Sequence, residues 1–422
     1  MVWGDSVSTS ITNFAPKVIK MKIGIIGGGA AGFFAAIQAK TNYPESTVII
    51  LEKSKKLLAK VKVSGGGRCN VTNSTPSISE LSKAYPRGGK QLKKLFQEFS
   101  NEHTLEWFTS RDVALYAQDD RRVFPVSNDS QSIIDCLMAE VNQLDISIKM
   151  DTAVKKLEAT AEGINVFFDD VNSVFFNKVI VASGGSPKKD GLRWLEKLGH
   201  EIVTPVPSLF TFNMPKEKIK SLMGVSVENA TTKIQGEKLI GNGPLLITHW
   251  GMSGPAVLSL SSFGARLLAD KNYQFNLQVN WTNEQSQEVV REGIQAIISE
   301  HGQKQLQNMR PYNLPSSLWL YLLNKVELPL VQKWDEIGKK GVHKLIEVLA
   351  NDVYEVSGKT TFKEEFVTCG GVSLNSVNMK TLESKHLPGL YFAGEVLDID
   401  AITGGYNFQA AWTTGFVAGK LK

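Results

Sequence analysis

The sequence predicts an α/β fold in which a Rossmann-type nucleotide domain carries a β-rich insertion and a helical insertion. Near the start of the chain, an apolar run at 22–26 leads directly into a Gly-rich turn and a helical pattern. Near its end, residues 389–421 repeat the order of strand, Gly-rich turn and helix. Between these regions the pattern changes to short strands and then to helices. We therefore expect the chain to leave its first sheet and to return to it.

The first Gly-rich turn has the spacing of a dinucleotide fingerprint, Gly27-x-Gly29-x-x-Gly32. Gly27 permits the tight turn, Gly29 lets the backbone approach a pyrophosphate, and Gly32 lets the helix pack close to the strand. Ala31 lies within the same turn, and an apolar helical run, 33–39, follows it. A helix N-terminus offers free N–H groups to phosphates. This segment is predicted to bind the pyrophosphate of a dinucleotide.

An acidic residue follows the second predicted strand, 47–51. Glu52 stands 20 residues after Gly32. A carboxylate at this place accepts hydrogen bonds from ribose hydroxyls and repels a 2′-phosphate. Lys53 lies beside it at the same strand end. We expect both residues to contact the cofactor.

A glycine triplet occurs in the segment 62–73, KVSGGGRCNVTN. Glycine permits close backbone approach, a guanidinium binds phosphate, and amides exchange hydrogen bonds with a flavin ring or a ribityl chain. The segment is predicted to be a loop laid against the cofactor. The residues assigned to the site are Gly66, Gly67, Arg68, Asn70 and Asn73.

Two further segments of the amino-terminal half are expected at the cofactor. A buried strand from 178 ends in the small residues Ala182, Ser183 and Gly184, as a strand does where it abuts a ligand. Val154 stands where a dinucleotide fold places a backbone contact to adenine.

The segment 389–421 is predicted to complete the site. A strand at 389–393 ends at acidic residues that can accept a ribityl hydroxyl hydrogen bond. A Gly-rich turn then opens the helix 408–421, whose N-terminal dipole would face the pyrimidine end of a flavin and favour hydride acceptance. Two complementary segments at opposite ends of the chain predict non-covalently bound FAD. The residues assigned here are Gly394, Glu395, Asp398, Gly404, Gly405, Tyr406, Asn407 and Gln409.

Six motifs together resemble the BaiN/YhiN-type flavoproteins, also described as aminoacetone oxidase-like or NAD(FAD)-utilising dehydrogenases. They are GGGAAG, SGGGRCNVTN, VIVASGG, LLITHWGMSGPAVL, VTCGGVSL and GLYFAGEVLDIDAITGGYNFQAAWTTG. The resemblance covers 21–421. It implies a glutathione-reductase-like FAD domain with an inserted β-barrel-like domain and an inserted helical domain. It also implies reductase activity, on steroid enones in some members and on a uridine of ribosomal RNA in others.

The expected domain limits follow from these patterns. The discontinuous FAD domain comprises 21–204 and 362–422. The β-rich domain comprises 205–282 with 351–361, because short strands alternate there with Gly, Pro and Asn. Residues 283–350 are helical by periodicity, with prolines as breaks. Residues 1–20 are expected to be a poorly ordered leader, because Met21 directly opens the first strand. They lack the basic and apolar parts of a signal peptide.

The predicted activity is that of an NAD(P)H-driven reductase of an electron-poor C=C bond. The chain has one fingerprint, so we expect NAD(P)H to bind transiently as the hydride donor. The candidates for catalysis are His249, which lies in a tight Gly- and Pro-rich loop, and Cys69, which lies in the glycine segment. Two other functions stay open: an amine oxidase that uses O2, and a flavin-bearing RNA-binding or assembly factor without turnover.

Composition limits the partners and the compartment. The net charge is +5, and 53–122 contains 14 Lys and Arg against 7 Asp and Glu, which suits ribosomal RNA or a phosphorylated nicotinamide. A small-molecule substrate is equally compatible. Three cysteines without CxxC spacing predict the cytoplasm, and six scattered histidines predict no metal site. No apolar run reaches the ~18–20 residues that span a bilayer. The oligomeric state is not predicted. The exposed basic cluster is expected at Lys83, Arg87, Lys90, Lys93 and Lys94.

Overall fold

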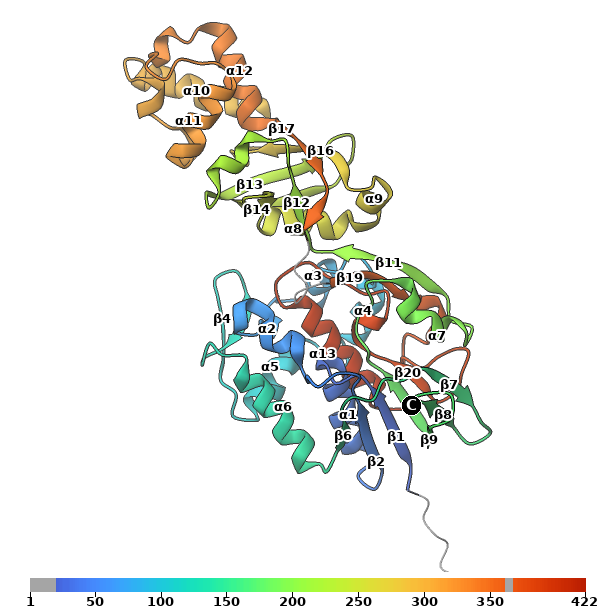
Figure 1. Cartoon of the computed structure of the whole chain (residues 1–422). Helices are drawn as coiled ribbons and strands as arrows, with labels where there is room; N and C mark the ends of the chain where they lie inside the picture. Colours follow the sequence, from blue (N-terminus) through green and yellow to red (C-terminus); the bar gives the residue numbers. More distant parts are fainter. Residues whose placement is uncertain (1–19, 361–366) are drawn as a thin grey trace, which may run out of the picture.

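The computed structural model describes residues 20–360 and 367–422, which form two bodies (Figure 1). The first body comprises 20–208 and 367–422, and it contains both ends of the described chain. The second body comprises 209–360. Each has its own cluster of buried apolar side chains, and the two clusters share no described residue.

The first body is built on a five-stranded parallel sheet with the order β20-β10-β1-β2-β6. Its central strands are buried on both faces, which accounts for their apolar sequences. The expected α/β class with a Rossmann-type sheet is confirmed. The strands are β1 (Lys22–Ile26), β2 (Thr47–Leu51), β6 (Ser147–Lys149), β10 (Lys178–Val181) and β20 (Leu390–Phe392).

The first and last helices of the chain pack side by side on this sheet (Figure 1). A Cβ at Gly415 would lie 2.7 Å from the carbonyl oxygen of Ala31, so the two helices approach too closely for a side chain. These helices are α1 (Ala30–Asn42) and α13 (Tyr406–Ala418). The other α-helices of this body are α2 (Ala59–Gly67), α3 (Ile78–Lys83), α4 (Gly89–Leu95), α5 (Asn101–Thr109), α6 (Gln131–Gln143) and α7 (Arg193–Glu196).

Three small antiparallel sheets complete the first body. One comprises β3 (Thr72–Asn73), β5 (Arg122–Pro125) and β4 (Leu115–Ala117). Another comprises β7 (Lys156–Ala159), β8 (Ile164–Phe167) and β9 (Ser173–Phe176). The third pairs β11 (Ile202–Ser208) with β19 (Val367–Val372), the strands by which the chain leaves the first body and returns to it.

The second body joins a seven-stranded antiparallel sheet to a group of helices. The strands are β12 (Thr211–Asn213), β13 (Ser226–Ile234), β14 (Ile240–Ile247), β15 (Gly251–Ser253), β16 (Gln274–Asn280), β17 (Asp352–Ser357) and β18 (Lys359–Thr360). The helices are α8 (Pro255–Phe263), α9 (Ala265–Asp270), α10 (Gln287–His301), α11 (Ser316–Lys325) and α12 (Gly338–Ala350). Short 3-10 helices occupy several connections in both bodies.

An ion pair to a buried carboxylate ties the helical part of the second body to its sheet. Lys325, at the end of α11, places Nζ 2.5 Å from a carboxylate oxygen of Asp352 at the start of β17. Asp352 also accepts hydrogen bonds from the Trp281 indole (3.0 Å) and the Tyr354 hydroxyl. Burial raises the pKa of Asp352, and the Lys325 ammonium opposes that effect.

Several segments differ from expectation. The glycine segment expected to be a loop begins inside α2, which is interrupted at 64–66 by non-helical backbone. Of the expected FAD-domain segment 362–422, residues 362–366 lie outside the described residues, as do 1–19 of the expected leader. That 205–282 with 351–361, and 283–350, fold as units remains a prediction. In the described chain, no helix is both long and apolar enough to cross a membrane.

A buried histidine gives the first body a predictable response to acid. The ring of His200 packs against Phe392 at 4.9 Å, and Nε2 lies 3.2 Å from the Ser384 hydroxyl. Nδ1 has no hydrogen-bond partner within the described residues. Burial, aided by the nearby His386, lowers the pKa of His200 to about 4. Below pH ~6.5 the unfolded chain therefore takes up a proton that folded His200 does not.

We predict that the free energy of unfolding falls between pH 6.5 and 4.5, with His200 contributing at most about 1.4 kcal/mol per pH unit. His200→Gln should reduce this slope, as measured by urea unfolding at each pH. His343→Gln is the control, since His343 is exposed on α12. An unchanged slope in the His200 variant would contradict the assignment.

Candidate functional site

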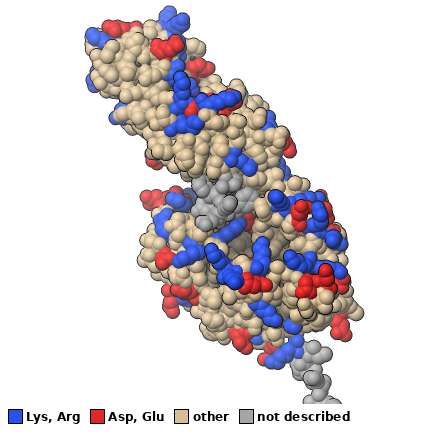
Figure 2. Space-filling view, viewed as in Figure 1, with Lys and Arg blue, Asp and Glu red and all other residues tan. Residues whose placement is uncertain are grey.

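A cavity of about 620 Å³ lies between the end of the parallel sheet and the second body. Its wall includes the fingerprint turn, part of α2, the end of β10 and the return segment 394–411. Lys and Arg side chains gather on the face of the first body shown in Figure 2. The sequence-assigned residues on its wall are Gly27, Gly29, Ala31, Glu52, Lys53, Asn70, Ala182, Ser183, Gly184, Gly394, Glu395, Gly404, Gly405 and Asn407.

The three fingerprint glycines differ in what surrounds them. A Cβ at Gly27 would lie 2.3 Å from the Ala182 carbonyl oxygen, and a Cβ at Gly32 would lie 1.9 Å from the Gly27 carbonyl oxygen. These two glycines are required by backbone packing. A Cβ at Gly29 would meet no atom within 4 Å, and the backbone there is extended (φ −96°). Gly29 therefore faces open space, where a ligand can approach the main chain.

A smaller cavity of about 180 Å³ adjoins the first near the end of β2. Val154 lines it together with Trp194. The Glu52 carboxylate stands between the cavities and accepts hydrogen bonds from the N–H groups of Gly28 (2.7 Å) and Ser54 (2.9 Å). The residues that line both cavities are Gly27, Glu52, Lys53, Ser183, Gly184 and Gly185.

The glycine segment contributes differently from the prediction. Gly65 and Asn70 line the cavity, whereas Gly66, Gly67, Arg68 and Asn73 do not. The Arg68 guanidinium lies over the Phe124 ring at 4.1 Å and donates to the Gly65 carbonyl oxygen (3.2 Å). Asn73 donates to the Gly404 carbonyl oxygen (3.1 Å). Arg68 and Asn73 therefore support the wall through contacts with the protein, and their contact with the cofactor stays a prediction.

The side chain of Asn70 links this segment to the return turn. With its amide oriented to satisfy both ends, the oxygen accepts from the Gly405 N–H (2.9 Å) and the nitrogen donates to the Thr72 carbonyl oxygen (2.9 Å). A Cβ at Gly405 would lie 2.3 Å from that same oxygen of Thr72. Hydrogen bonding and close backbone packing thus fix the turn that opens α13.

Of the acidic residues in the return segment, Glu395 faces the cavity and Asp398 does not. Glu395 accepts from Lys60 Nζ (2.6 Å) and from the Thr368 N–H (2.8 Å). The two carboxylate oxygens of Asp398 accept hydrogen bonds from one guanidinium nitrogen of Arg266, Nη2, at 2.8 and 2.7 Å. Since Asp398 is engaged by Arg266 and lies outside the cavity wall, its contact with the cofactor stays a prediction.

Two residues of α13 also lie behind the wall. Gln409 is fully buried, and its oxygen accepts hydrogen bonds from Thr72 (2.6 Å) and Thr104 (2.9 Å). The Tyr406 hydroxyl lies 3.2 Å from the Thr75 hydroxyl. Both side chains are occupied in packing the helix against the β3 region. Gly32 likewise lies outside the cavity wall.

Neither candidate for catalysis reaches the cavity wall. Cys69 is fully buried, and burial raises the pKa of its thiol to about 12, so the nucleophilic thiolate is disfavoured. His249 is exposed in the connection between β14 and β15, with its ring 3.8 Å from that of Trp250. From the same sequence motif, Ser253 lines the cavity instead.

Sequence reasoning missed the wall contributed by other elements. The second body supplies Leu209, Thr211, Ser253 and Leu258. Ser253 lies in the Gly- and Pro-rich motif of the sequence analysis, and this motif was the sequence feature that could have assigned Ser253 to the cavity wall. Further residues that were missed are Gly28, Ala30, Ser54, Lys56, Leu58, Ala59, Lys60, Val61, Ser64, Gly65, Arg122, Phe124, Gly185, Val367, Ile399, Thr403, Phe408, Ala410 and Ala411.

The residues present fit FAD. The two adjoining cavities offer an elongated space, the backbone at Gly29 and Gly184 is open to it, and Glu52 stands at the strand end beside the fingerprint. The N-terminus of α13 borders the same space through Gly405. This arrangement suits a dinucleotide with its pyrophosphate at α1 and its other end toward α13.

A family model described as "HI0933-like protein Rossmann domain" matches residues 21–421. The chain belongs to this family. The resemblance found in the sequence is thereby confirmed, and the HI0933-like chain is an FAD-dependent oxidoreductase.

Curated relatives match the HI0933-like chain over nearly its whole length. A 3-dehydro-bile acid delta(4,6)-reductase of Clostridium scindens is 28% identical and covers 94% of this chain and 98% of the relative. A ribosomal RNA dihydrouridine synthase of Escherichia coli is 27% identical, covering 93% and 95%. Among solved structures, a flavocytochrome c3 fumarate reductase aligns with a TM-score of 0.49 and 15% identity, covering 96% of this chain and 78% of that one.

We predict that Gly29→Val abolishes FAD binding and leaves the fold intact. A Cβ at Gly29 would enter the open space at the fingerprint with no protein atom within 4 Å. Isothermal titration of apoprotein with FAD, with circular dichroism melting of the apoprotein, measures both effects. Gly32→Val is the contrasting variant and should lower the melting temperature, because its side chain collides with the Gly27 carbonyl. Wild-type FAD affinity in Gly29→Val would overturn the placement of the pyrophosphate.

Proposed function

We propose that this HI0933-like protein is an NAD(P)H-driven, FAD-dependent reductase of an electron-poor C=C bond. One observation carries the proposal: the space beside the fingerprint continues to a wall supplied by the second body. A substrate in that space would lie between the cofactor-binding segments and the second body. The names of the relatives, which include a delta(4,6)-reductase and a dihydrouridine synthase, support the same reaction class.

The first body supplies the groups that would hold FAD without a covalent link. Backbone at Gly29 and the start of α1 would receive the pyrophosphate, and Glu52 the ribose. Glu395, fixed by Lys60 and Thr368, would accept a ribityl hydroxyl, and the N-terminus of α13 would face the pyrimidine end. Bound FAD supplies the centre that accepts and donates hydride.

The second body would shape the substrate end of the cavity. Leu209 and Leu258 present apolar surface, which excludes water from the reacting bond. Thr211 and Ser253 place hydroxyls on the same wall and can orient a carbonyl by hydrogen bonding. An apolar wall with a few polar groups is typical of a site for a small molecule.

The hydride donor is proposed to be NAD(P)H, bound transiently at the cavity mouth. Lys53, Lys56 and Lys60 line the cavity, and their charges attract phosphate groups. A cytoplasmic location is part of the proposal. It is supported by the cysteines, since Cys69, Cys136 and Cys369 are all free and buried.

The substrate is proposed to be either a small enone or a uridine in ribosomal RNA. Arg87 is not an exposed member of the expected basic cluster, because its side chain forms a buried ion pair with Asp400. Lys83, Lys90, Lys93 and Lys94 remain exposed on α3 and α4 and could attract RNA.

We predict that NADH or NADPH reduces the bound flavin rapidly and that O2 reoxidises it slowly. Stopped-flow absorbance with each nicotinamide, with and without O2, measures both steps. Fast reoxidation by O2 without reduction by either nicotinamide would support an amine oxidase. A flavin that reacts with neither the nicotinamides nor O2 would support a structural cofactor.

Acid precipitation should release the flavin into the supernatant, and flavin kept in the pellet would contradict non-covalent binding.

We predict for the RNA substrate that Lys90, Lys93 and Lys94 reversed to Glu weaken RNA association and flatten its salt dependence. The flavin content should stay normal, since none of the three lines the cavity. Mass spectrometry of ribosomal RNA from a deletion strain decides the substrate. An unchanged dihydrouridine content would exclude the RNA and leave a small electron-poor alkene.

A further inference from the structure

The two bodies meet through polar contacts instead of a shared hydrophobic core. The apolar cluster of the first body draws on 23–202 and 372–421, and that of the second body on 210–356, with no described residue in common. The chain crosses between them beside the β11–β19 pair. Their relative placement therefore depends on the polar groups at the junction.

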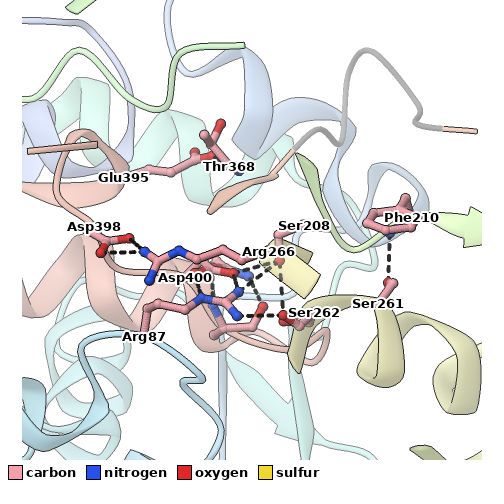
Figure 3. Close-up of polar contacts among 12 residues, drawn as sticks. Arg87, Ser208, Phe210, Ser261, Ser262, Arg266, Thr368, Glu395, Asp398 and Asp400 are labelled. Carbon is pink, nitrogen blue, oxygen red and sulfur yellow. Dashed lines mark hydrogen bonds and ion pairs between the residues drawn. The ribbon is translucent and has the colours of Figure 1, made fainter. Parts of the chain in front are cut away.

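A buried ion pair between Arg87 and Asp400 lies at the centre of this junction (Figure 3). Arg87 Nε donates to Asp400 Oδ1 at 2.6 Å, and Nη2 contacts the second carboxylate oxygen. Asp400 is fully buried, and the Arg87 side chain is 10% exposed. The two residues also form a backbone bridge. Charge-assisted, two-point contacts of this kind fix geometry as well as charge.

The pair extends to the second body through Ser208, at the end of the first body, and Ser262, in the second. Arg87 Nη1 donates to the Ser262 carbonyl oxygen on α8 at 2.6 Å. The hydroxyl of Ser208, at the end of β11, donates to Asp400 Oδ2 at 2.6 Å and lies 3.3 Å from the Ser262 hydroxyl. Both serines are fully buried. One charge pair thus joins the return segment, β11 and α8.

Each of these three segments also carries a residue of the cavity wall. Ile399 precedes Asp400, Leu209 follows Ser208, and Leu258 lies one turn before Ser262 on α8. Arg87 itself is followed by Gly88, where a Cβ would lie 2.6 Å from Ile399 Cγ1. A displacement of the ion pair would therefore move the wall that faces the proposed substrate.

A second contact lies on the other side of Ile399. Arg266 of α9 binds both oxygens of Asp398 (Figure 3). Its side chain is 47% exposed, so water screens this pair more than the buried one. The buried pair is the stronger constraint on the wall.

We propose that Arg87 is a positioning residue that, through Asp400, Ser208 and Ser262, fixes the second-body wall of the cavity over the cofactor-binding segments. Its kinetic consequence rests on the proposed reductase function, whereas its effect on the placement of the bodies does not.

The test compares Arg87→Met with Lys325→Met. Both variants leave a buried carboxylate unpaired, but the Lys325–Asp352 pair lies within the second body, away from the junction. Spin labels at Glu102→Cys on α5 and Glu300→Cys on α10 report the distance between the bodies, because the three native cysteines are buried. Double electron–electron resonance should give a broader distance distribution for Arg87→Met and the wild-type distribution for Lys325→Met.

Arg87→Lys should give an intermediate width, since an ammonium keeps the charge but lacks the guanidinium fork. In the loaded enzyme, Arg87→Met should lower kcat/KM by about 100-fold at unchanged FAD content, the effect of misplacing reacting groups by ~1 Å. A distribution for Arg87→Met as narrow as the wild type, or equal broadening in Lys325→Met, would overturn the proposal. If no C=C substrate is turned over, the distance measurement still decides the role of Arg87, and only the proposed function fails.

Discussion

Close backbone contact at the fingerprint turn is the constraint on which the rest of this structure depends. The Gly32 Cα lies so near the Gly27 carbonyl oxygen, and Gly27 so near the Ala182 carbonyl oxygen, that neither position has space for a side chain. The turn after β1, the start of α1 and the end of β10 therefore meet main chain to main chain. The packing of Gly415 against Ala31 adds α13 to the same layer. The cavity floor consequently presents backbone groups, which is the surface that a pyrophosphate requires.

Two ion pairs among the described residues, Lys325–Asp352 and Arg87–Asp400, each place a buried carboxylate against a cation. They show that the effect of an ion pair on stability differs from its effect on geometry. Burial raises the pKa of both Asp352 and Asp400, and the neighbouring cation opposes it in each case. Desolvation offsets much of the attraction in such pairs, so an apolar replacement of similar volume would stabilise as well. What the apolar replacement lacks is a directed, two-point contact. The position of the Arg87–Asp400 pair between two separate apolar clusters is consistent with a role in orientation.

Much of the first body could be predicted because its signals are local. The β1 and β2 strands, the fingerprint and Glu52 follow one another within a short segment, and the structure reproduces the expected strand limits. Local sequence signals do not identify the residue that faces the cavity where two residues of the same chemical type lie close together in the sequence. Nothing in the sequence distinguishes Gly65 from Gly66, or Glu395 from Asp398, as the residue that faces the cavity. Only the fold decides, by bringing Arg266 to Asp398.

Contacts between distant segments explain the other failures. Arg87 belongs to a basic stretch and would be expected at the surface, but Asp400 lies far along the chain and buries it. Arg68 would be expected to bind phosphate, yet the Phe124 ring provides a nearer surface for its guanidinium. Leu209 and Leu258 are single apolar residues without a motif, and they reach the cavity only because the second body is placed over it.

The composition of the cavity separates cofactor binding from substrate choice. The first body supplies the fingerprint, Glu52 and the return turn, which line the part of the cavity that is proposed to hold FAD. The second body supplies Leu209, Thr211, Ser253 and Leu258, which face the remaining space. Relatives named for a bile acid and for ribosomal RNA match this chain about equally, at 28% and 27% identity. Overall similarity therefore does not discriminate between their substrates. Under the proposed function, substrate choice by this chain would depend on the few side chains of the second-body wall and on how firmly the junction holds that wall in place.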